Sequence, residues 1–174
     1  KEWLGDGVDE EVRQVVRRQI EKLTAKGYEV EEVSLPSLDY SLAVYYIIVP
    51  AEVASNLARY DGIRYGVRPE GTKSLSDVYE QSRSNGYMPE NKRRIMIGNY
   101  VLSSGYYDAY YRKAQKVRTI MRDAYAKAFA ECDVMLMPVS PTPATKIGEL
   151  ISDPQANMLS DLYTTTINQV GITS

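Results

Sequence analysis

The side chains able to do chemistry in this chain of 174 residues are hydroxyls, lysines and carboxylates, because the sequence has no histidine and one cysteine, Cys132. Catalysis by Ser-His-Asp or Cys-His groups requires an imidazole base, so this chain alone can complete neither arrangement. A single thiol also excludes an internal disulfide and a zinc site made of His and Cys ligands. A chain without a disulfide fits the reducing cytoplasm, where we expect the protein to act.

Two clusters of basic residues, 92–94 and 112–122, are the clearest candidates for binding an anion. In the first cluster, Arg94 precedes the apolar residues 95–97, so we expect its side chain to face inward and that of Lys92 to face solvent. A buried guanidinium requires an anionic partner, which is either a carboxylate of the protein or a ligand. The second cluster is balanced by nearby carboxylates, and both a solvated helix surface and a phosphate-binding stripe remain open.

Several other polar residues have a simple structural interpretation when they are considered alone. Tyr45 lies in a strongly apolar stretch, which favours core packing with a bonded hydroxyl, and Asp161 lies in an amphipathic pattern typical of a surface carboxylate. Residues 66–74 resemble a phosphate-binding loop, but Thr72 separates the second glycine from the lysine, which indicates a chance match. Residues 103–105 (SSG) predict a helix end, because no base lies beside the serines.

The overall composition is that of an ordinary globular domain. The chain has 21 Lys and Arg against 23 Asp and Glu, a formal charge of −2, which gives no general attraction to nucleic acid or to an anionic membrane. No apolar run reaches the roughly 20 residues that span a bilayer, so we expect no membrane association. Tyrosine is unusually frequent, with 15 residues against one Phe and one Trp, which favours hydrogen-bonded clefts or interfaces.

The elements that must position these residues are mostly helices. Hydrophobic periodicity and capping residues predict helices over residues 9–26, 42–60 with a break or kink at Pro50, 74–83, 91–103, 106–130, and from near 154 past 163. Asp9 is the expected cap of the first helix, Ser74 or Ser76 that of the third, and Asp153 that of the last, and residues 84–86 are expected to form a turn. Short strands are expected at 28–35 and 134–137, and a helix followed closely by a strand indicates an α/β layer. Because the chain begins with lysine and offers two isolated strands, we expect a fragment of a larger α/β protein.

Seven stretches of sequence together carry a specific resemblance. They are YYII at 45–48, SNLARYDGIRYG at 55–66, KRRI at 92–95, SSGYYDAYY at 103–111, QKVR at 115–118, PVSPTPA at 138–144 and DLYT at 161–164. In combination and spacing they closely resemble the A subunits of glutamyl-tRNA(Gln)/aspartyl-tRNA(Asn) amidotransferases, within the amidase signature family. The likeness covers essentially the whole chain, with departures at Ala54, where the family often has Ser, and at residues 166–171.

The resemblance implies an α/β fold in which helices flank a large mixed sheet. Residues 1–174 would be the helix-rich C-terminal part of a single amidase domain, lacking the Gly/Ser-rich signature segment and the final strands. The family hydrolyses glutamine with a Ser-Ser-Lys triad that needs no histidine, and both serines and the lysine precede the region matched by this chain. The resemblance therefore predicts no catalytic residue here and no activity for this piece alone.

The resemblance also implies the partners of the protein. Glutamine is the substrate, and its ammonia passes to a partner subunit that uses ATP and magnesium to amidate Glu or Asp misacylated onto tRNA. The complete enzyme would be a heterotrimer with B and C subunits, which contacts tRNA mainly through the partner. No cofactor or metal is expected in this chain itself.

Three residues match the positions that bind glutamine in the family. The resemblance assigns Arg94 to the α-carboxylate of glutamine, Asp161 to its α-ammonium group and Tyr45 to the wall of the same pocket. The chemistry is consistent, because a planar guanidinium pairs with a carboxylate and a carboxylate pairs with an ammonium. Such a pair of charges would select a free amino acid amide over a peptide or fatty amide.

Two other functions remain open from the sequence. The chain could belong to a general amidase for small carboxamides, which requires no pair of charges around a zwitterion. It could also be a helical module that binds protein or RNA through residues 106–111 and 112–122.

Overall fold

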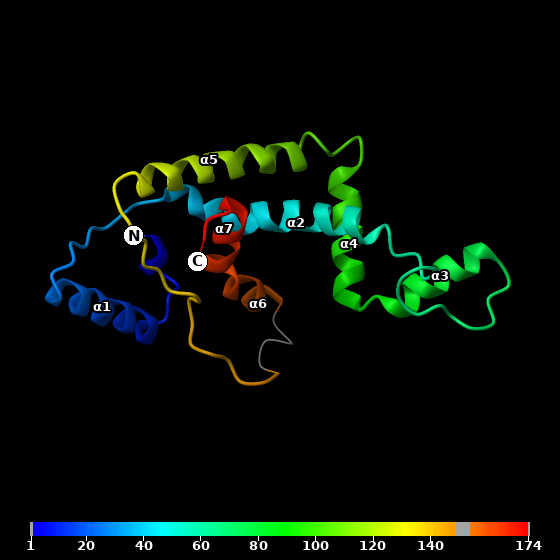
Figure 1. Ribbon diagram of the computed structural model, residues 1–174, viewed down its shortest axis with the longest axis horizontal. Helices are drawn as coiled ribbons and strands as arrows, with labels where there is room; N and C mark the ends of the chain where they lie inside the picture. Colours follow the sequence, from blue (N-terminus) through cyan, green and yellow to red (C-terminus); the bar gives the residue numbers. More distant parts are fainter. Residues whose placement is uncertain (1, 149–153, 174) are drawn as a thin grey trace. The chain divides into compact units, whose positions relative to one another are not determined.

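The computed structural model describes residues 2–148 and 154–173, and the chain divides into two compact units. The first unit consists of Lys1–Tyr45 and Lys116–Ser174, and the second of Tyr46–Gln115. The helices are α1 (Glu10–Ala25), α2 (Ser41–Leu57), α3 (Leu75–Gly86), α4 (Pro89–Leu102), α5 (Tyr111–Phe129), α6 (Pro154–Ser160) and α7 (Leu162–Val170), with the short 3-10 helices η1 (Glu2–Leu4) and η2 (Pro36–Tyr40) (Figure 1).

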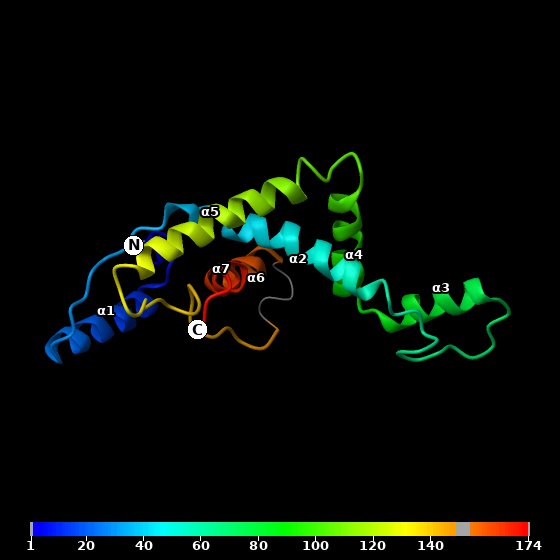
Figure 2. The ribbon, with the colours of Figure 1, turned by 45° about the horizontal axis from the view of Figure 1, so that its top comes forward.

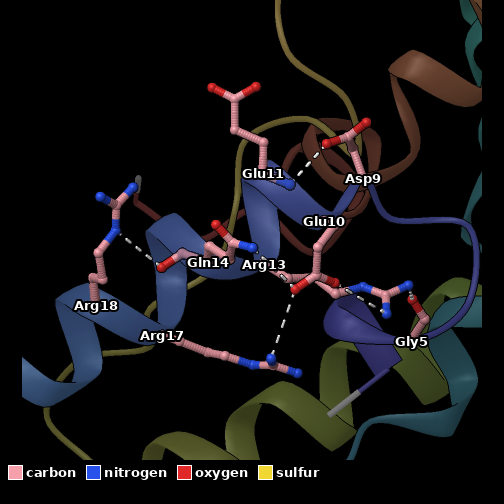
Figure 3. Close-up of polar contacts among 8 residues, drawn as sticks. All are labelled: Gly5, Asp9, Glu10, Glu11, Arg13, Gln14, Arg17 and Arg18. Atoms are coloured by element: carbon pink, nitrogen blue, oxygen red, sulfur yellow. Dashed lines mark hydrogen bonds and ion pairs between the residues drawn. The ribbon is translucent and has the colours of Figure 1, made fainter.

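Polar side chains fix the start of α1 in the first unit (Figure 3). The Asp9 carboxylate accepts a hydrogen bond from a backbone N–H two residues on, at 2.8 Å, which confirms the predicted cap. The Glu10 carboxylate forms ion pairs with Arg13 at 3.9 Å and Arg17 at 3.8 Å, one helical turn or more away. Arg13 also donates to the Gly5 carbonyl at 2.9 Å, which attaches the preceding turn to the helix.

Large apolar side chains from distant parts of the sequence form the core of the first unit. Its buried members come from η2 and the residue before it, α5 and α7: Leu35, Leu38, Met121, Tyr125, Ile167 and Val170. Figures 1 and 2 both show α7 beside α5, and Met121 is completely enclosed there. Two long-range hydrogen bonds complete the unit, from the Tyr163 hydroxyl to the Trp3 carbonyl at 3.1 Å and from Gln169 to the Ser41 carbonyl at 2.9 Å.

In the second unit, α4 crosses α2 at a glycine (Figure 1). A Cβ atom at Gly98 would lie 2.0 Å from the Pro50 carbonyl oxygen and 2.6 Å from the Ala54 Cβ. Only a residue without a side chain permits two helix backbones to approach so closely. This contact therefore sets the separation of α2 and α4.

The end of α2 is held by the C-terminal part of α3. Arg83 donates to the carbonyls of Leu57 at 3.3 Å and Tyr60 at 3.0 Å, and the Tyr87 hydroxyl donates to Leu57 at 3.0 Å. The Arg83 guanidinium also lies 5.2 Å from the centre of the Tyr87 ring. These bonds satisfy carbonyls that a helix end would otherwise leave without partners. The start of α3 is closed by a capping box between Ser74 and Asp77, so the cap is Ser74 and not Ser76.

Several helices differ from the prediction. Of the break or kink expected at Pro50, the break is wrong, because α2 continues from Ser41 to Leu57; the buried proline forgoes one N–H bond and packs against α4 instead. The turn expected at 84–86 is wrong, because α3 continues to Gly86. The helix expected from residue 106 begins at Tyr111, since the carbonyl of Ser103 accepts bonds from two amides of an intervening turn.

Neither predicted strand, at 28–35 or at 134–137, is a strand in the described part of the chain. The segment 134–137 keeps a strand-like alternation, because Met135 and Met137 pack on the core of the first unit while Val134 and Leu136 are exposed. It is therefore not the buried strand that we expected. The physical reason is that a strand requires a neighbour to pair its N–H and C=O groups, and the described residues provide none for these segments.

Candidate functional site

A groove of about 460 Å³ lies between α2 and α4, entirely within the second unit. Its lining combines apolar side chains with carboxylates, amides and one guanidinium: Val49, Glu52, Val53, Asn56, Leu57, Glu90, Asn91 and Arg94. The mixture of an apolar wall and a few convergent polar groups is typical of a site for a small polar ligand. The groove therefore contains one of the predicted binding residues, Arg94.

The Arg94 side chain is the most sheltered of its basic cluster, as predicted. Its relative exposure is 27%, against 48% for Arg93, while Lys92 is exposed and donates to the Ser84 carbonyl at 2.7 Å. The anionic partner that a sheltered guanidinium requires is present in the protein, because Arg94 Nε donates to Glu90 Oε1 at 2.8 Å. Glu90 was not singled out from the sequence, although its spacing from Arg94 is that of a helical ion pair.

Glu90 is shared between two arginines at the start of α4. Arg93 donates to both oxygens of Glu90 at 2.7 Å, in addition to the bond from Arg94. The bonds from Arg93 and then Arg94 outweigh the effect of partial burial and lower the pKa of Glu90 to about 2. Glu90 in turn raises the pKa of Arg93, with a smaller contribution from Tyr46 on α2. The three groups are therefore fully charged at neutral pH and carry a net charge of about +1.

Asp161 lies at a break in the C-terminal helical region. The single helix predicted from near residue 154 is two helices in the structure. The first, α6, ends at Ser160, and α7 begins at Leu162 with Asp161 as its N-cap. Its carbonyl accepts bonds from Thr165 N–H at 3.0 Å and the Thr164 hydroxyl at 3.2 Å, but its carboxylate makes no capping bond. An Asp in this position usually bonds the first amides of the helix, whereas Asp161 is exposed and makes no such bond. Asp153, the cap predicted for the start of this helical region, lies outside the described residues.

Tyr45 is half-buried on α2, in the part of the helix that belongs to the first unit. Asp161 belongs to the same unit, whereas Arg94 belongs to the second. The grouping of all three side chains around one ligand therefore stays a prediction.

Several exposed tyrosines gather at the other end of α4 and in the turn that follows it. The Tyr100 and Tyr106 rings stack with centres 4.3 Å apart, and Tyr110 lies 6.0 Å from each. Hydrogen bonding with Tyr106 is the main cause that raises the pKa of Tyr100 to about 12. These residues bond one another, which fits the sequence expectation that tyrosine hydroxyls find polar partners.

Other sequence features have local structural explanations. The segment resembling a phosphate-binding loop follows helix α2 and leads into the Ser74 cap, so it lacks the preceding strand of that motif. Within the described residues, no group of three His, Cys, Asp or Glu side chains is arranged to hold a metal ion. Within the described ranges, no helix has the length and apolar character needed to cross a bilayer.

Comparison with known proteins identifies the family. The family model described as Amidase matches residues 1–174, so the chain belongs to the amidase family. The A subunit of glutamyl-tRNA(Gln) amidotransferase from Clostridium botulinum is 52% identical over 172 residues, which are 99% of this chain and 36% of that protein. The corresponding A subunit from Desulforamulus reducens is 50% identical over the same shares of the two chains.

A solved structure supports the same relationship. The crystal structure of the A subunit of glutamyl-tRNA(Gln) amidotransferase from Thermotoga maritima superposes with a TM-score of 0.68 at 33% sequence identity. The match covers 98% of this chain and 32% of that one. The chain therefore spans about a third of the length of these relatives.

Proposed function

We propose that this chain is part of the glutamine-hydrolysing A subunit of a tRNA-dependent amidotransferase, a carbon–nitrogen ligase that uses glutamine as amide donor. The observation that carries the proposal is the identity of 50–52% with proteins of this kind across 99% of the chain. The ammonia would pass to a partner subunit that uses ATP and magnesium to amidate misacylated Glu-tRNA(Gln) or Asp-tRNA(Asn). We expect the assembly, with B and C subunits, to act in the cytoplasm.

The contribution of this chain would be one wall of the glutamine-binding pocket. Arg94 would bind the α-carboxylate, Asp161 the α-ammonium group, and Tyr45 would pack beside the substrate. In support, Arg94 lines the groove on α4 and the Asp161 carboxylate makes no capping bond. Two opposite charges beside the α-carbon of glutamine would disfavour substrates that lack either charge, because the unmatched charge of the protein would be left without a partner.

The remaining features of the complete domain are part of the same proposal. Residues 1–174 would belong to a single amidase domain in which the segments 28–35 and 134–137 join a mixed sheet with strands of the rest of the protein. The alternation of exposed and packed residues in 134–137 supports this pairing. The Ser-Ser-Lys triad has no match in this chain, so we expect the isolated chain to show no glutaminase activity.

The test uses a complete A subunit containing this chain, assembled with its partners, and compares glutamine with 4-aminobutanamide, which lacks the α-carboxylate. Arg94→Ala should raise the KM for glutamine about 30- to 150-fold, because a hydrogen-bonded charge pair contributes about 2–3 kcal/mol, and should leave the KM for 4-aminobutanamide unchanged. Arg112→Ala is the matched control, since Arg112 is an exposed arginine of the same unit that also pairs with a carboxylate, Asp108 at 3.2 Å.

The companion variant is Asp161→Asn, with glutaramate, which lacks the α-ammonium group, as the second substrate. Its KM for glutamine should rise by a similar factor while its KM for glutaramate stays constant. Unchanged KM and kcat for glutamine in Arg94→Ala would contradict the assignment of Arg94. Equal rises in the KM for glutamine and for small carboxamides in Arg94→Ala would favour a general amidase.

A further inference from the structure

The contact between Glu90 and Arg94 restricts how Arg94 can meet a ligand. A guanidinium can bind a carboxylate through its side edge, formed by Nε and one terminal nitrogen, or through its end edge, formed by Nη1 and Nη2. In this structure Nε donates to Glu90 Oε1 at 2.8 Å. The contact through Nε therefore ties the orientation of the Arg94 guanidinium to Glu90.

Glu90 is itself held in place. It is the second residue of α4, after Pro89, where a carboxylate is favoured by the positive end of the helix. Arg93 binds both of its oxygens at 2.7 Å, so Glu90 cannot rotate without breaking a bidentate pair. Both Glu90 and Arg94 line the groove. A fixed carboxylate therefore anchors the guanidinium of Arg94 at the wall of the groove.

We propose that Glu90 is a positioning residue for Arg94, which holds its guanidinium in the orientation that receives the α-carboxylate of the substrate. This inference rests on the proposed function. An arginine side chain has several rotatable bonds, and fixing them when a ligand binds lowers the affinity through lost conformational entropy. Because Glu90 already holds the Arg94 side chain before the substrate binds, less entropy is lost at the binding step. Glu90 would thus act through Arg94 and not by touching the substrate.

A second carboxylate–arginine pair in the same unit shows what an ordinary pair looks like. Asp108 and Arg112 have the same spacing of four residues, a longer separation of 3.2 Å, and exposures of 76% and 64%. Such exposed pairs contribute little and do not orient a binding group. The Glu90 pair differs because its arginine is sheltered, faces the groove and is held by a carboxylate that a third residue fixes.

The charge of Glu90 provides a test with two opposite outcomes. Glu90→Gln raises the net charge of the cluster of Glu90, Arg93 and Arg94 from about +1 to about +2. If Glu90 acted only through its charge, its removal would strengthen the attraction of a substrate carboxylate and lower the KM for glutamine. If it positions Arg94, the same change must raise the KM, because the anchoring bond is weakened.

The experiment measures both substrates, glutamine and 4-aminobutanamide, in the complete assembled enzyme. We expect Glu90→Gln to raise the KM for glutamine about tenfold with kcat within about twofold, and to leave 4-aminobutanamide unaffected. Asp108→Asn removes the same charge from the exposed pair and should change neither the KM nor the kcat for either substrate. Glu90→Asp retains the charge but shortens the side chain, and should raise the KM for glutamine as Glu90→Gln does.

Three results would overturn the inference. The first is an unchanged or lowered KM for glutamine in Glu90→Gln while Arg94→Ala still raises it. The second is an equal loss of kcat with both substrates together with a lowered melting temperature, which would make Glu90 purely structural. The third is a normal KM in Glu90→Asp. An Arg94→Ala variant with unchanged glutamine kinetics would instead contradict the proposed function itself, so the two failures are distinguishable.

Discussion

The two units of this chain are stabilised in different ways. The first encloses large side chains such as Met121 and Tyr125, and its core joins segments more than a hundred residues apart. In the second, small residues occupy the closest contacts: Gly98 meets the Pro50 carbonyl, and a Cβ at Gly62 would lie 2.0 Å from the Ser82 hydroxyl oxygen. Both units bury apolar side chains, but the second, which buries Ile48, Val78 and Val101, also depends on close contacts that only glycine permits.

The difference explains why the charged groove forms in the second unit. Gly98 lies one helical turn beyond Arg94, and Ala54 lies two residues before Asn56, so the glycine contact sets the distance between the two walls of the groove. Close backbone packing leaves the longer polar side chains beside the crossing and not within it. A small residue at the contact thus determines the dimensions of a site that it does not line.

The largest effect is expected at this glycine. Gly98→Ala places a Cβ against a backbone oxygen that cannot move independently, which should destabilise the second unit by more than about 3 kcal/mol. Hydrogen exchange in the complete protein should show lost protection in α4 while the core of the first unit stays protected. Gly86→Ala is the control, because no atom lies within 4 Å of its added Cβ. Equal loss of protection in both units would show that they unfold together.

A cavity in the first unit should have a somewhat smaller effect. Met121→Ala removes a completely enclosed side chain and should destabilise that unit by about 2 to 3 kcal/mol, as measured by hydrogen exchange of α5 and α7. Ile120→Ala, at an exposed neighbour on the same helix, should change little. Lost protection in α4 equal to that in α5 and α7 would contradict the assignment of Met121 to the core of the first unit.

The smallest effect concerns a carboxylate of the first unit. Burial raises the pKa of Glu2, but hydrogen bonds from Leu35 N–H at 2.8 Å and the Ser34 hydroxyl outweigh it and lower the pKa to about 2. Because the pKa of Glu2 in the folded protein lies below the ordinary value of 4.5, the contribution of the ionised Glu2 to the free energy of unfolding is complete above about pH 4.5. It is lost as the pH falls toward 2. We expect this contribution to be about 1 kcal/mol, since the group is partly exposed.

The measurement compares exchange of the Leu35 amide in the natural protein and in Glu2→Gln at each pH. At pH 6 the natural protein should exchange about fivefold more slowly, and the difference should disappear near pH 2. A difference that persists unchanged at pH 2 would contradict the assigned hydrogen bonds.

Much of the helical structure could be predicted from the sequence, because its signals are local. The Asp9 and Ser74 caps act on amides within three residues, and the apolar residues after Arg94 predict its sheltered side chain. The missing histidine first excluded whole classes of catalysis and is consistent with the proposed enzyme, in which Arg94 and Asp161 need no imidazole. The pair of Glu90 and Arg94 could also have been predicted, because residues four apart on a helix lie about one turn from each other.

The tertiary structure decided what depends on neighbours far away in the sequence. Pro50 remains inside a helix because α4 packs against it, and the segment 134–137 is not a strand because no strand lies beside it in the described residues. The break at Asp161 likewise has no strong local signal, although it gives this carboxylate its position. Caps and periodicity act over a few residues, whereas pairing and close packing require two distant segments to meet. The sequence therefore determined the helices and the charged residues of this protein, and the tertiary structure determined where a groove could form between them.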